Sequence, residues 1–263
     1  MPPVTSPTSK PKKVRVRPVP AVSRAIAILR LLGRSPTPLG VKSIADSLGM
    51  VTSTCLHIVR VLVAEGLLRL DESTKRYSLG AGVLSLARSV IQTNPFPALA
   101  QPMLDRITEK WSVTTMASEI LDIDHMVVVA LSKPEAPFGL HVDVGSRFPT
   151  LISATGRLVA AFSRFPPDKI EKNLRSLKWA SPPRLDEWRQ EVELVRSRRF
   201  SIDHGNYISG VTLVGTAVFD TKGRMTHSLT AAGVADQMSE KAIKSVAMDL
   251  LRAADELTNL SPI

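Results

Sequence analysis

Two short amphipathic segments, joined by a three-residue turn that begins with a glycine, most strongly limit how this chain can fold. The first is predicted to form a helix over about 41–48, closed by Gly49. The second is predicted to form a helix over about 52–65, ending at Gly66. Two short helices joined by so tight a turn indicate a helix-turn-helix pair.

The flanking segments extend this pair into a small domain. An earlier helical pattern starts at Val22, and Gly33 stands where its C-terminal cap is expected. After the second helix of the pair, 67–70 and 76–79 are predicted to be short strands around a polar turn. Three helices followed by a β-hairpin make a winged helix-turn-helix domain, a fold that binds DNA through its third helix.

The third predicted helix has two distinct faces. Its apolar positions recur at i, i+3, i+4 and i+7 and are expected to face the core: Cys55, Ile58, Val59 and Leu62. The opposite face carries small hydroxyls and longer donors: Thr52, Ser53, Thr54, His57 and Arg60. Small hydroxyls fit close to base edges, and longer donors reach bases or phosphates. An ordinary surface helix shows the same pattern, so this face alone leaves both interpretations open.

The net charge of +10 is concentrated at the N-terminal end. Nine basic residues and no acidic residue precede Asp46, whereas 81–263 carry 21 basic and 20 acidic residues. This asymmetry favours a polyanionic partner, although a solvated basic tail is the alternative. Residues 1–20 contain six prolines and are expected to form a disordered basic arm. Further candidate DNA contacts lie in this arm and in the hairpin: Lys12, Lys13, Arg15, Arg17, Lys75 and Arg76.

Composition indicates the cellular compartment in which the chain is expected to work. The single cysteine, Cys55, excludes an internal disulfide and fits a reducing cytoplasm. The apolar runs are too short to span a bilayer, and the first residues show no apolar secretory segment. We therefore expect a cytoplasmic protein with no membrane partner.

The remaining two thirds of the chain are predicted to form an α+β domain with an antiparallel sheet. Residues 81–94 are expected to be a linker helix between a DNA-binding domain over 21–80 and this second domain over 95–263. Helices are predicted over 98–111, 157–162, 168–173, 186–198 and 239–257. Strands are predicted over 113–121, 126–132, 139–144, 200–203, 211–219 and 225–232.

Several fragments, in a common order along the chain, resemble the IclR family of bacterial transcriptional regulators. In the first domain they are 23–29, 44–49, 53–54, 65–68 and 76–80. In the second domain, 144–149 resembles the family's Gly-x-Arg-x-Pro stretch and 153–157 its Ser-Ala-x-Gly-Lys stretch. Residues 210–220 resemble its Gly-Val-x-Cys-(Ile/Val)-Ala-Ala-Pro-Val-Phe-Asp segment. Together the fragments extend over some 230 residues, which makes the resemblance specific.

The resemblance implies a regulator that binds palindromic operators in double-stranded DNA as a dimer or a dimer of dimers. It implies a GAF-like second domain that binds a small-molecule effector, often a carboxylic acid or an aromatic metabolite, and it implies no cofactor and no metal. The positions that match the family's ligand pocket are Phe148, Ser153, Ala154, Thr155, Gly156, Asp203, Val211, Leu213, Thr230 and Ala232. The sign of the response is not fixed by the resemblance, because members repress or activate.

Some of these positions have simpler interpretations. Residues 153–156 directly precede a predicted helix, so their backbone N–H groups and the helix dipole would favour an anion such as a carboxylate. Ser153 or Thr155 could instead only cap that helix. Asp203 is as well suited to a turn made by its own side chain as to ligand contact.

The chain departs from the family pattern at both sites. Thr52 and His57 replace a lysine and an arginine of the third helix, and we expect the basic arm to supply part of the missing attraction to DNA. Leu213 replaces a cysteine, and Ala232 stands where a serine is frequent. Both changes remove polar groups, so the resemblance predicts a more apolar effector than a two-carbon acid, either aromatic or branched.

Two other functions compete with a regulator. A small hydrolase would need a nucleophile, yet the chain has no Gly-x-Ser-x-Gly, P-loop, Gly-x-Gly-x-x-Gly or His-Glu-x-x-His motif. His141 and Asp143 could point to one side of a strand, but two residues do not complete a metal site. A non-specific, nucleoid-type DNA binder would use the basic arm, but it would not need the large, charge-balanced second domain.

Overall fold

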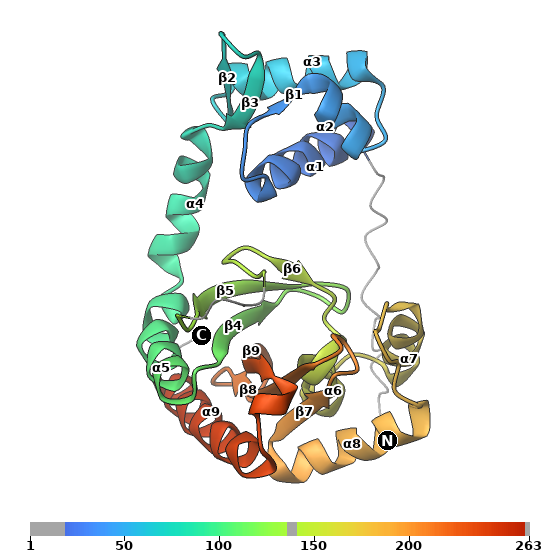
Figure 1. Ribbon diagram of the computed structural model, residues 1–263, viewed down its shortest axis with the longest axis vertical. Coiled ribbons are helices and arrows are strands. Elements are labelled where there is room, and N and C mark those ends of the chain that lie inside the picture. The colour runs from blue at the N-terminus through green and yellow to red at the C-terminus, as the bar shows by residue number, and fades with distance from the viewer. Residues whose placement is uncertain (1–18, 136–140, 261–263) are drawn as a thin grey trace, which may run out of the picture. The chain divides into compact units, whose positions relative to one another are not determined.

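A computed structural model describes residues 19–135 and 141–260 of the chain (Figure 1). The chain divides into two compact units, one ending at Thr93 and the other starting at Asn94. The basic residues predicted in the arm, Lys12, Lys13, Arg15 and Arg17, lie outside the described residues.

The first unit is a three-helix domain with a small sheet. Its elements are α1 (Pro20–Arg34), β1 (Leu39–Gly40), α2 (Val41–Ser47), α3 (Thr52–Ala64), β2 (Leu68–Asp71), β3 (Arg76–Leu79) and α4 (Gly82–Thr93). The strands form an antiparallel sheet in the order β1-β3-β2. The axes of α2 and α3 meet at 115°, within the range of a helix-turn-helix pair. The predicted winged helix-turn-helix fold is therefore confirmed.

The glycine positions explain the turns of this unit. Gly49, between α2 and α3, has a φ of 61°, and Gly66, after α3, has a φ of 69°. Glycine adopts this left-handed backbone without the steric penalty of a Cβ atom. Gly33 differs from expectation, because it lies inside α1, which continues to Arg34 and is capped by Ser35. Strand β1, which pairs Leu39 with Tyr77, was not predicted, because two residues carry no periodicity.

The second unit contains one six-stranded antiparallel sheet in the order β6-β5-β4-β9-β8-β7. Its strands are β4 (Thr114–Ile120), β5 (Met126–Ser132), β6 (Arg147–Phe148), β7 (Phe200–His204), β8 (Val211–Phe219) and β9 (Met225–Val234). Its helices are α5 (Phe96–Trp111), α6 (Ser153–Phe162), α7 (Pro167–Ser176), α8 (Leu185–Arg198), the short 3-10 helix η1 (Ala235–Gln237) and α9 (Glu240–Leu260). The predicted α+β class and antiparallel sheet are confirmed.

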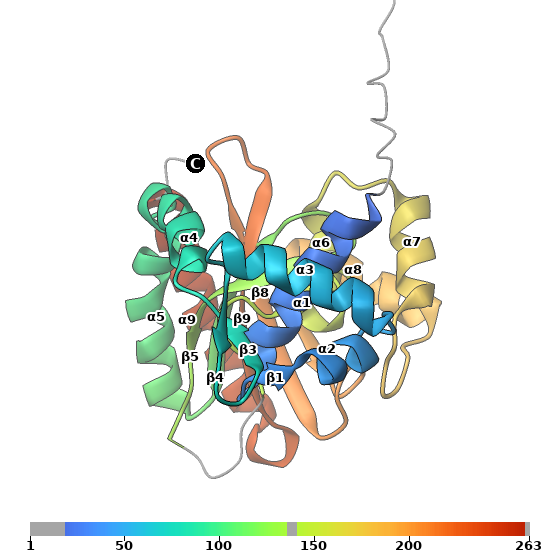
Figure 2. The ribbon, with the colours of Figure 1, turned by 90° about the horizontal axis from the view of Figure 1, so that it is seen from above.

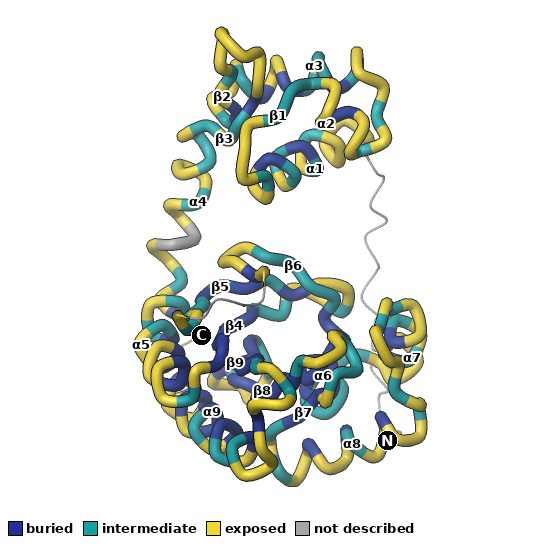
Figure 3. Tube along the Cα trace, viewed as in Figure 1, coloured by how far each residue is buried: buried dark blue, intermediate teal, exposed yellow. Residues whose placement is uncertain are grey.

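Helices cover both faces of this sheet. Helices α5 and α9 lie on one side, and α6, α7 and α8 lie on the other (Figure 1, Figure 2). Strand β8 shows why, because its side chains alternate between the two faces. Val214 and Val218 join the core under α5 and α9, whereas Ala217 packs with Leu158 of α6. The central strands β4, β8 and β9 are consequently buried over most of their length (Figure 3).

Several element boundaries differ from the predicted ones. The strand expected over 139–144 is not formed by 141–144, and its first two residues lie outside the described part of the chain. Helix α5 begins at Phe96 rather than at residue 98, because the Asn94 side chain accepts a hydrogen bond from the Phe96 N–H. Helix α6 begins at Ser153 rather than at residue 157.

Within the described part of the chain, no helix on its own has the length and apolarity of a membrane span; the bent pair α2 and α3 meets that test only jointly.

Candidate functional site

The outer face of α3 presents polar side chains to solvent. Thr52, Ser53, His57 and Arg60 are exposed, and Thr54 is half-buried. The inner face holds Cys55, Val59 and Leu62 in the core of the first unit, while Ile58 is half-buried against it. Polar residues therefore lie on the outer face of α3 and apolar residues on its inner face, as the 3.6-residue period of a helix requires.

The hairpin beside α3 carries the two other predicted cations. Lys75, at a left-handed φ of 54°, forms an exposed ion pair with Glu72 at 2.6 Å. Arg76 donates a hydrogen bond through Nη1 to the Pro38 carbonyl at 3.3 Å. Arg60 and Lys75 both line one cleft of about 420 Å³ in this unit. The helix face and the hairpin therefore border a common cationic surface.

The second unit contains a cavity of about 310 Å³ with mostly apolar walls. Strands β4, β5, β6, β8 and β9, the start of α6 and two loops contribute the lining: Met116, Ser118, Met126, His141, Val142, Phe148, Ile152, Ser153, Thr155, Tyr207, Ile208, Leu213 and Thr230. Five of the ten positions predicted for the effector lie in this lining, namely Phe148, Ser153, Thr155, Leu213 and Thr230.

The other five predicted positions do not line the cavity. Ala154, Val211 and Ala232 belong to the apolar cluster that contains the lining residue Leu213. Gly156 is pressed against the chain before α6, where a Cβ atom would lie 2.0 Å from the Leu151 carbonyl oxygen. Asp203 is fully buried, and its Oδ1 accepts hydrogen bonds from the backbone N–H groups that open the following loop.

Ser153 is the most unusual residue of the cavity. It starts α6 with a φ of 57°, a backbone conformation that strains residues other than glycine. Only 5% of the residue is exposed, and its Oγ has no hydrogen-bond partner among the described residues. Buried hydroxyls normally have a partner, so this one is available to a ligand. The first N–H groups of α6 add the positive end of the helix dipole at the same point.

The Thr155 and Thr230 hydroxyls of the lining do have hydrogen-bond partners. Thr155 shares weak hydrogen bonds through Oγ1 with Ser228 Oγ at 3.3 Å and Thr230 Oγ1 at 3.4 Å. Burial raises the pKa of the Tyr207 phenol above its ordinary value, so this side chain is neutral at physiological pH. The cavity therefore offers hydroxyl groups and a helix start within apolar walls.

Sequence reasoning did not identify several lining residues, including Met116, His141, Tyr207 and Ile208. Met116 enters the cavity because β4 pairs with β9, which places it opposite Thr230. Tyr207 and Ile208 enter through the loop after β7. No local sequence pattern determines which strands pair or which path a loop takes. These positions could therefore have been predicted only from a resemblance to a known family.

The His141 and Asp143 pair does not form a metal centre in the described structure. Asp143 is exposed and accepts a hydrogen bond from Lys133 Nζ at 2.9 Å, while His141 lines the cavity. The described residues contain no group of three His, Cys, Asp or Glu side chains that could hold a metal ion.

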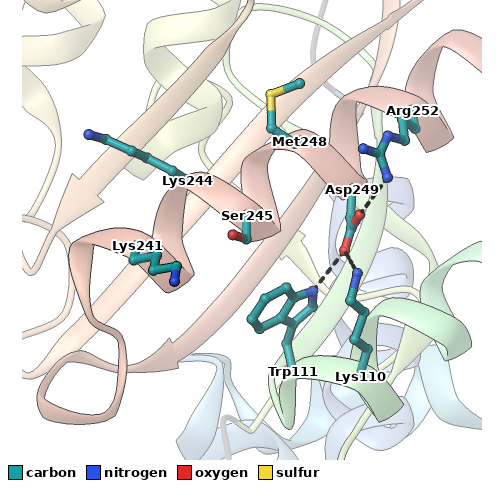
Figure 4. A pocket seen from close by; sticks show the side chains of 8 residues that line it. All are labelled: Lys110, Trp111, Lys241, Lys244, Ser245, Met248, Asp249 and Arg252. Atoms are coloured by element: carbon teal, nitrogen blue, oxygen red, sulfur yellow. Dashed lines mark hydrogen bonds and ion pairs between the residues drawn. The ribbon is translucent and has the colours of Figure 1, made fainter.

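A larger and more open cleft, of about 610 Å³, lies between α5 and α9 (Figure 4). Asp249 organises it by accepting hydrogen bonds from Lys110 Nζ, Trp111 Nε1 and Arg252 Nη1. The cations Lys110 and Arg252 are exposed to solvent. None of the buried polar atoms that lack a partner in the described residues belongs to this cleft. The enclosed cavity at α6 is therefore the better ligand site.

These two units define a class of protein: a winged helix-turn-helix domain joined to a cavity-bearing α+β domain. The family model for the IclR helix-turn-helix domain matches residues 21–72, and the model described as the bacterial transcriptional regulator IclR C-terminal domain matches residues 88–259. The chain belongs to the IclR family of bacterial transcriptional regulators.

Individual relatives agree in length and fold. The chain is 23% identical over 223 residues to a glycerol operon regulatory protein of Streptomyces griseus, covering 84% of this chain and 87% of that protein. An IclR transcriptional regulator from Alicyclobacillus acidocaldarius has a similar structure, with a TM-score of 0.78 and 23% identity over 92% of this chain and 99% of that one. An IclR homologue from Microbacterium hydrocarbonoxydans, solved with 4-hydroxybenzoate, has a TM-score of 0.73 and 17% identity over 92% and 100%.

Proposed function

We propose that this regulator reads a specific operator with α3 and that a small organic acid, bound in the cavity at α6, modulates that binding. The observation that carries the proposal is the buried Ser153 hydroxyl, which has no hydrogen-bond partner among the described residues, lies at the N-terminal end of α6 and lines an apolar cavity. One carboxylate would satisfy both the hydroxyl and the first N–H groups of the helix.

The walls indicate the rest of the effector. Met116, Phe148 and Leu213 surround the space beyond Ser153 and favour an apolar body over a second charged group. We therefore propose a monocyclic aromatic or branched aliphatic acid. The relative solved with 4-hydroxybenzoate supports an aromatic acid for a cavity of this fold.

The DNA partner follows from α3 and from symmetry. We propose that two copies of the chain place their α3 helices about 34 Å apart, the spacing of successive major grooves on one side of a palindromic operator. Leu84 and Leu86 on α4 are 71% and 66% exposed, so this helix carries apolar side chains that a second copy of the chain could contact. The lone buried thiol of Cys55 fits the cytoplasm that we propose as the protein's location.

We further propose that the cavity binds its ligand without transforming it. The ionisable side chains in its lining are His141 and Tyr207, and neither is hydrogen-bonded to a lining hydroxyl in the described structure. An activated nucleophile would need such a base within reach.

A ligand screen followed by a DNA-binding assay tests this function. Thermal unfolding would be followed with benzoate, 4-hydroxybenzoate, a branched 2-oxo acid and glyoxylate, and each acid that stabilises the protein would be added to gel shifts on upstream DNA. We expect stabilisation by an aromatic or branched acid and a changed affinity for a specific duplex. Stabilisation by glyoxylate alone contradicts the proposed effector class.

A matched duplex of random sequence separates a regulator from a non-specific, nucleoid-type binder. At physiological salt, the regulator should bind the specific duplex at least 10³-fold more tightly. Equal affinity for both duplexes, or failure to retard any duplex at low ionic strength, contradicts the proposal.

A further inference from the structure

Among the described residues that are fully buried, Arg157 has the largest side chain. It lies on α6, four residues after Ser153, and its guanidinium contacts the start of its own helix, helix α8 and the loop after β7. Nε donates a hydrogen bond to Glu191 on α8, Nη1 donates to the Ser153 carbonyl at 3.0 Å, and Nη2 donates to Asn206 Oδ1 at 2.9 Å. A guanidinium suits such a junction because its donors point outward in a fixed plane.

Two of these contacts lead directly to the cavity. Ser153 lines it from α6, and the loop that carries Asn206 also carries the lining residues Tyr207 and Ile208. Arg157 itself does not line the cavity, so it joins the two parts of the wall from behind.

Asp203 fastens the same loop from the end of β7. Its Oδ1 accepts hydrogen bonds from the N–H groups of Asn206 at 2.7 Å and Tyr207 at 3.4 Å. Its Oδ2 has no hydrogen-bond partner among the described residues and lies 3.6 Å from Arg157 Nη1. The loop is therefore held in part by a buried ion pair between Asp203 and Arg157, and no hydrogen bond joins these two side chains in the described structure.

Packing alone does not account for a charged group at this place. Desolvating a guanidinium and a carboxylate costs more than their attraction returns unless the geometry is good, and an apolar side chain of similar volume would fill the space. What the arginine adds is a set of directed bonds to the helix start, to the loop and to α8.

We propose that Arg157 is a positioning residue that holds the 205–210 loop against the N-terminal end of α6 and thereby sets the affinity of the cavity for a carboxylate ligand. This inference rests on the proposed function of the cavity. A ligand that contacts both Ser153 and Tyr207 would contact both parts of the cavity wall that Arg157 connects. The hydrogen bond to Glu191 extends this connection to α8.

The test compares Arg157→Lys, Asn206→Ala and the double variant with the wild type in the full chain. Arg189→Lys is the matched control, because Arg189 pairs with Glu171 between α8 and α7 and does not line the cavity. Two quantities are measured: the backbone hydrogen-exchange rates of Asn206 and Tyr207 without ligand, and the dissociation constant of benzoate by calorimetry.

We expect exchange at Asn206 and Tyr207 to accelerate about tenfold in Arg157→Lys and in Asn206→Ala, since each loses a hydrogen bond that holds the loop. Benzoate affinity should fall about tenfold in each variant and no further in the double variant, because both changes break one connection. Arg189→Lys should change neither quantity. A purely structural role would lower the unfolding temperature without this non-additive loss of affinity.

Unchanged exchange in both single variants, or losses of affinity that multiply in the double variant, would overturn the role of Arg157. If Arg157→Lys does not fold, Asn206→Ala carries the test, because Asn206 is a half-buried loop residue. If benzoate binds neither wild type nor variants, the proposed effector class is contradicted, and the exchange rates alone still decide whether Arg157 holds the loop.

Discussion

The two units of this regulator present their polar groups in opposite ways. On α3 of the first unit, Ser53, His57 and Arg60 are exposed to water, which DNA would replace under the proposed function. In the second unit Ser153, Thr155 and Asp203 are buried, and Ser153 Oγ and Asp203 Oδ2 have no hydrogen-bond partner among the residues that the structure describes. The first unit therefore offers an exposed surface to a partner, whereas the second offers an enclosed cavity to a ligand.

This difference has consequences for stability. An exposed site can change with little effect on the folded state, whereas a buried site is built from residues that also hold the unit together. Substitutions in the two units, and a change of pH, test this contrast.

Glycine substitutions should separate the units most clearly. Gly156→Ala would place a Cβ atom 2.0 Å from the Leu151 carbonyl oxygen, a backbone atom that cannot move aside cheaply. We expect the second unit to lose about 3 kcal/mol of unfolding free energy, measured by thermal or urea unfolding. Gly40→Ala in the first unit meets nothing within 4 Å and should cost less than about 1 kcal/mol. Equal losses of unfolding free energy in the two variants would contradict the expected difference in packing between the two units.

His227 should make the second unit sensitive to acid. Its ring stacks on Phe96 with centroids 3.7 Å apart, and burial lowers its pKa from 6.5 to about 4. The folded state then resists protonation, so the stabilising effect of neutral His227 is complete above pH 6.5 and is lost as the pH falls from 6.5 toward 4. We expect a loss of about 2.5 kcal/mol between pH 6.5 and 4.5.

The control for this prediction removes the imidazole itself. His227→Gln should flatten the pH dependence of unfolding over that interval. A wild-type stability that does not depend on pH between 6.5 and 4.5 would show that the His227 environment is misassigned.

Two serines should divide stability from ligand binding. Ser153→Ala removes a hydroxyl without a partner in the described structure, so unfolding should change by less than about 0.5 kcal/mol. Its affinity for an acid that stabilises the wild type should fall about tenfold, as measured by calorimetry, because a hydrogen bond to a charged group is lost. Ser201→Ala should do the reverse and cost about 1 kcal/mol of stability, because Ser201 Oγ donates to the Ala154 carbonyl at 2.8 Å.

A substitution on α3 should affect DNA binding alone. Arg60→Gln removes an exposed charge from the reading face, so the affinity for duplex DNA should fall several-fold and its salt slope should decrease by about 1. Fluorescence anisotropy over a series of salt concentrations measures both quantities. Arg189→Gln on α8 is the control and should change neither. A full salt slope in Arg60→Gln would exclude a phosphate contact at this residue.

The same contrast explains what the sequence could predict. The core face of α3, with Cys55 and Val59, follows a local period of 3.6 residues and was predicted correctly. The cavity depends on pairings such as Met116 with Thr230, which are far apart along the chain and leave no local signal. The strand expected around His141 failed for a related reason, because β5 pairs instead with the two-residue strand β6.

The charge network around Arg157 was likewise beyond prediction. The resemblance aligned this position with a lysine of the family pattern, but nothing in the sequence connects it to Glu191 on α8 or to Asn206 after β7. Those contacts arise only once α6, α8 and the sheet are packed. A family pattern can therefore locate a candidate cavity without revealing what holds its wall.

The most direct test of the account is a titration of a stabilising acid into the complex of the full chain with a specific duplex, followed by fluorescence anisotropy. We expect the acid to shift the midpoint of DNA binding for the wild type and to do so far more weakly for Ser153→Ala. The account is contradicted if the acid leaves wild-type DNA binding unchanged, or if Ser153→Ala responds as strongly at the same acid concentration.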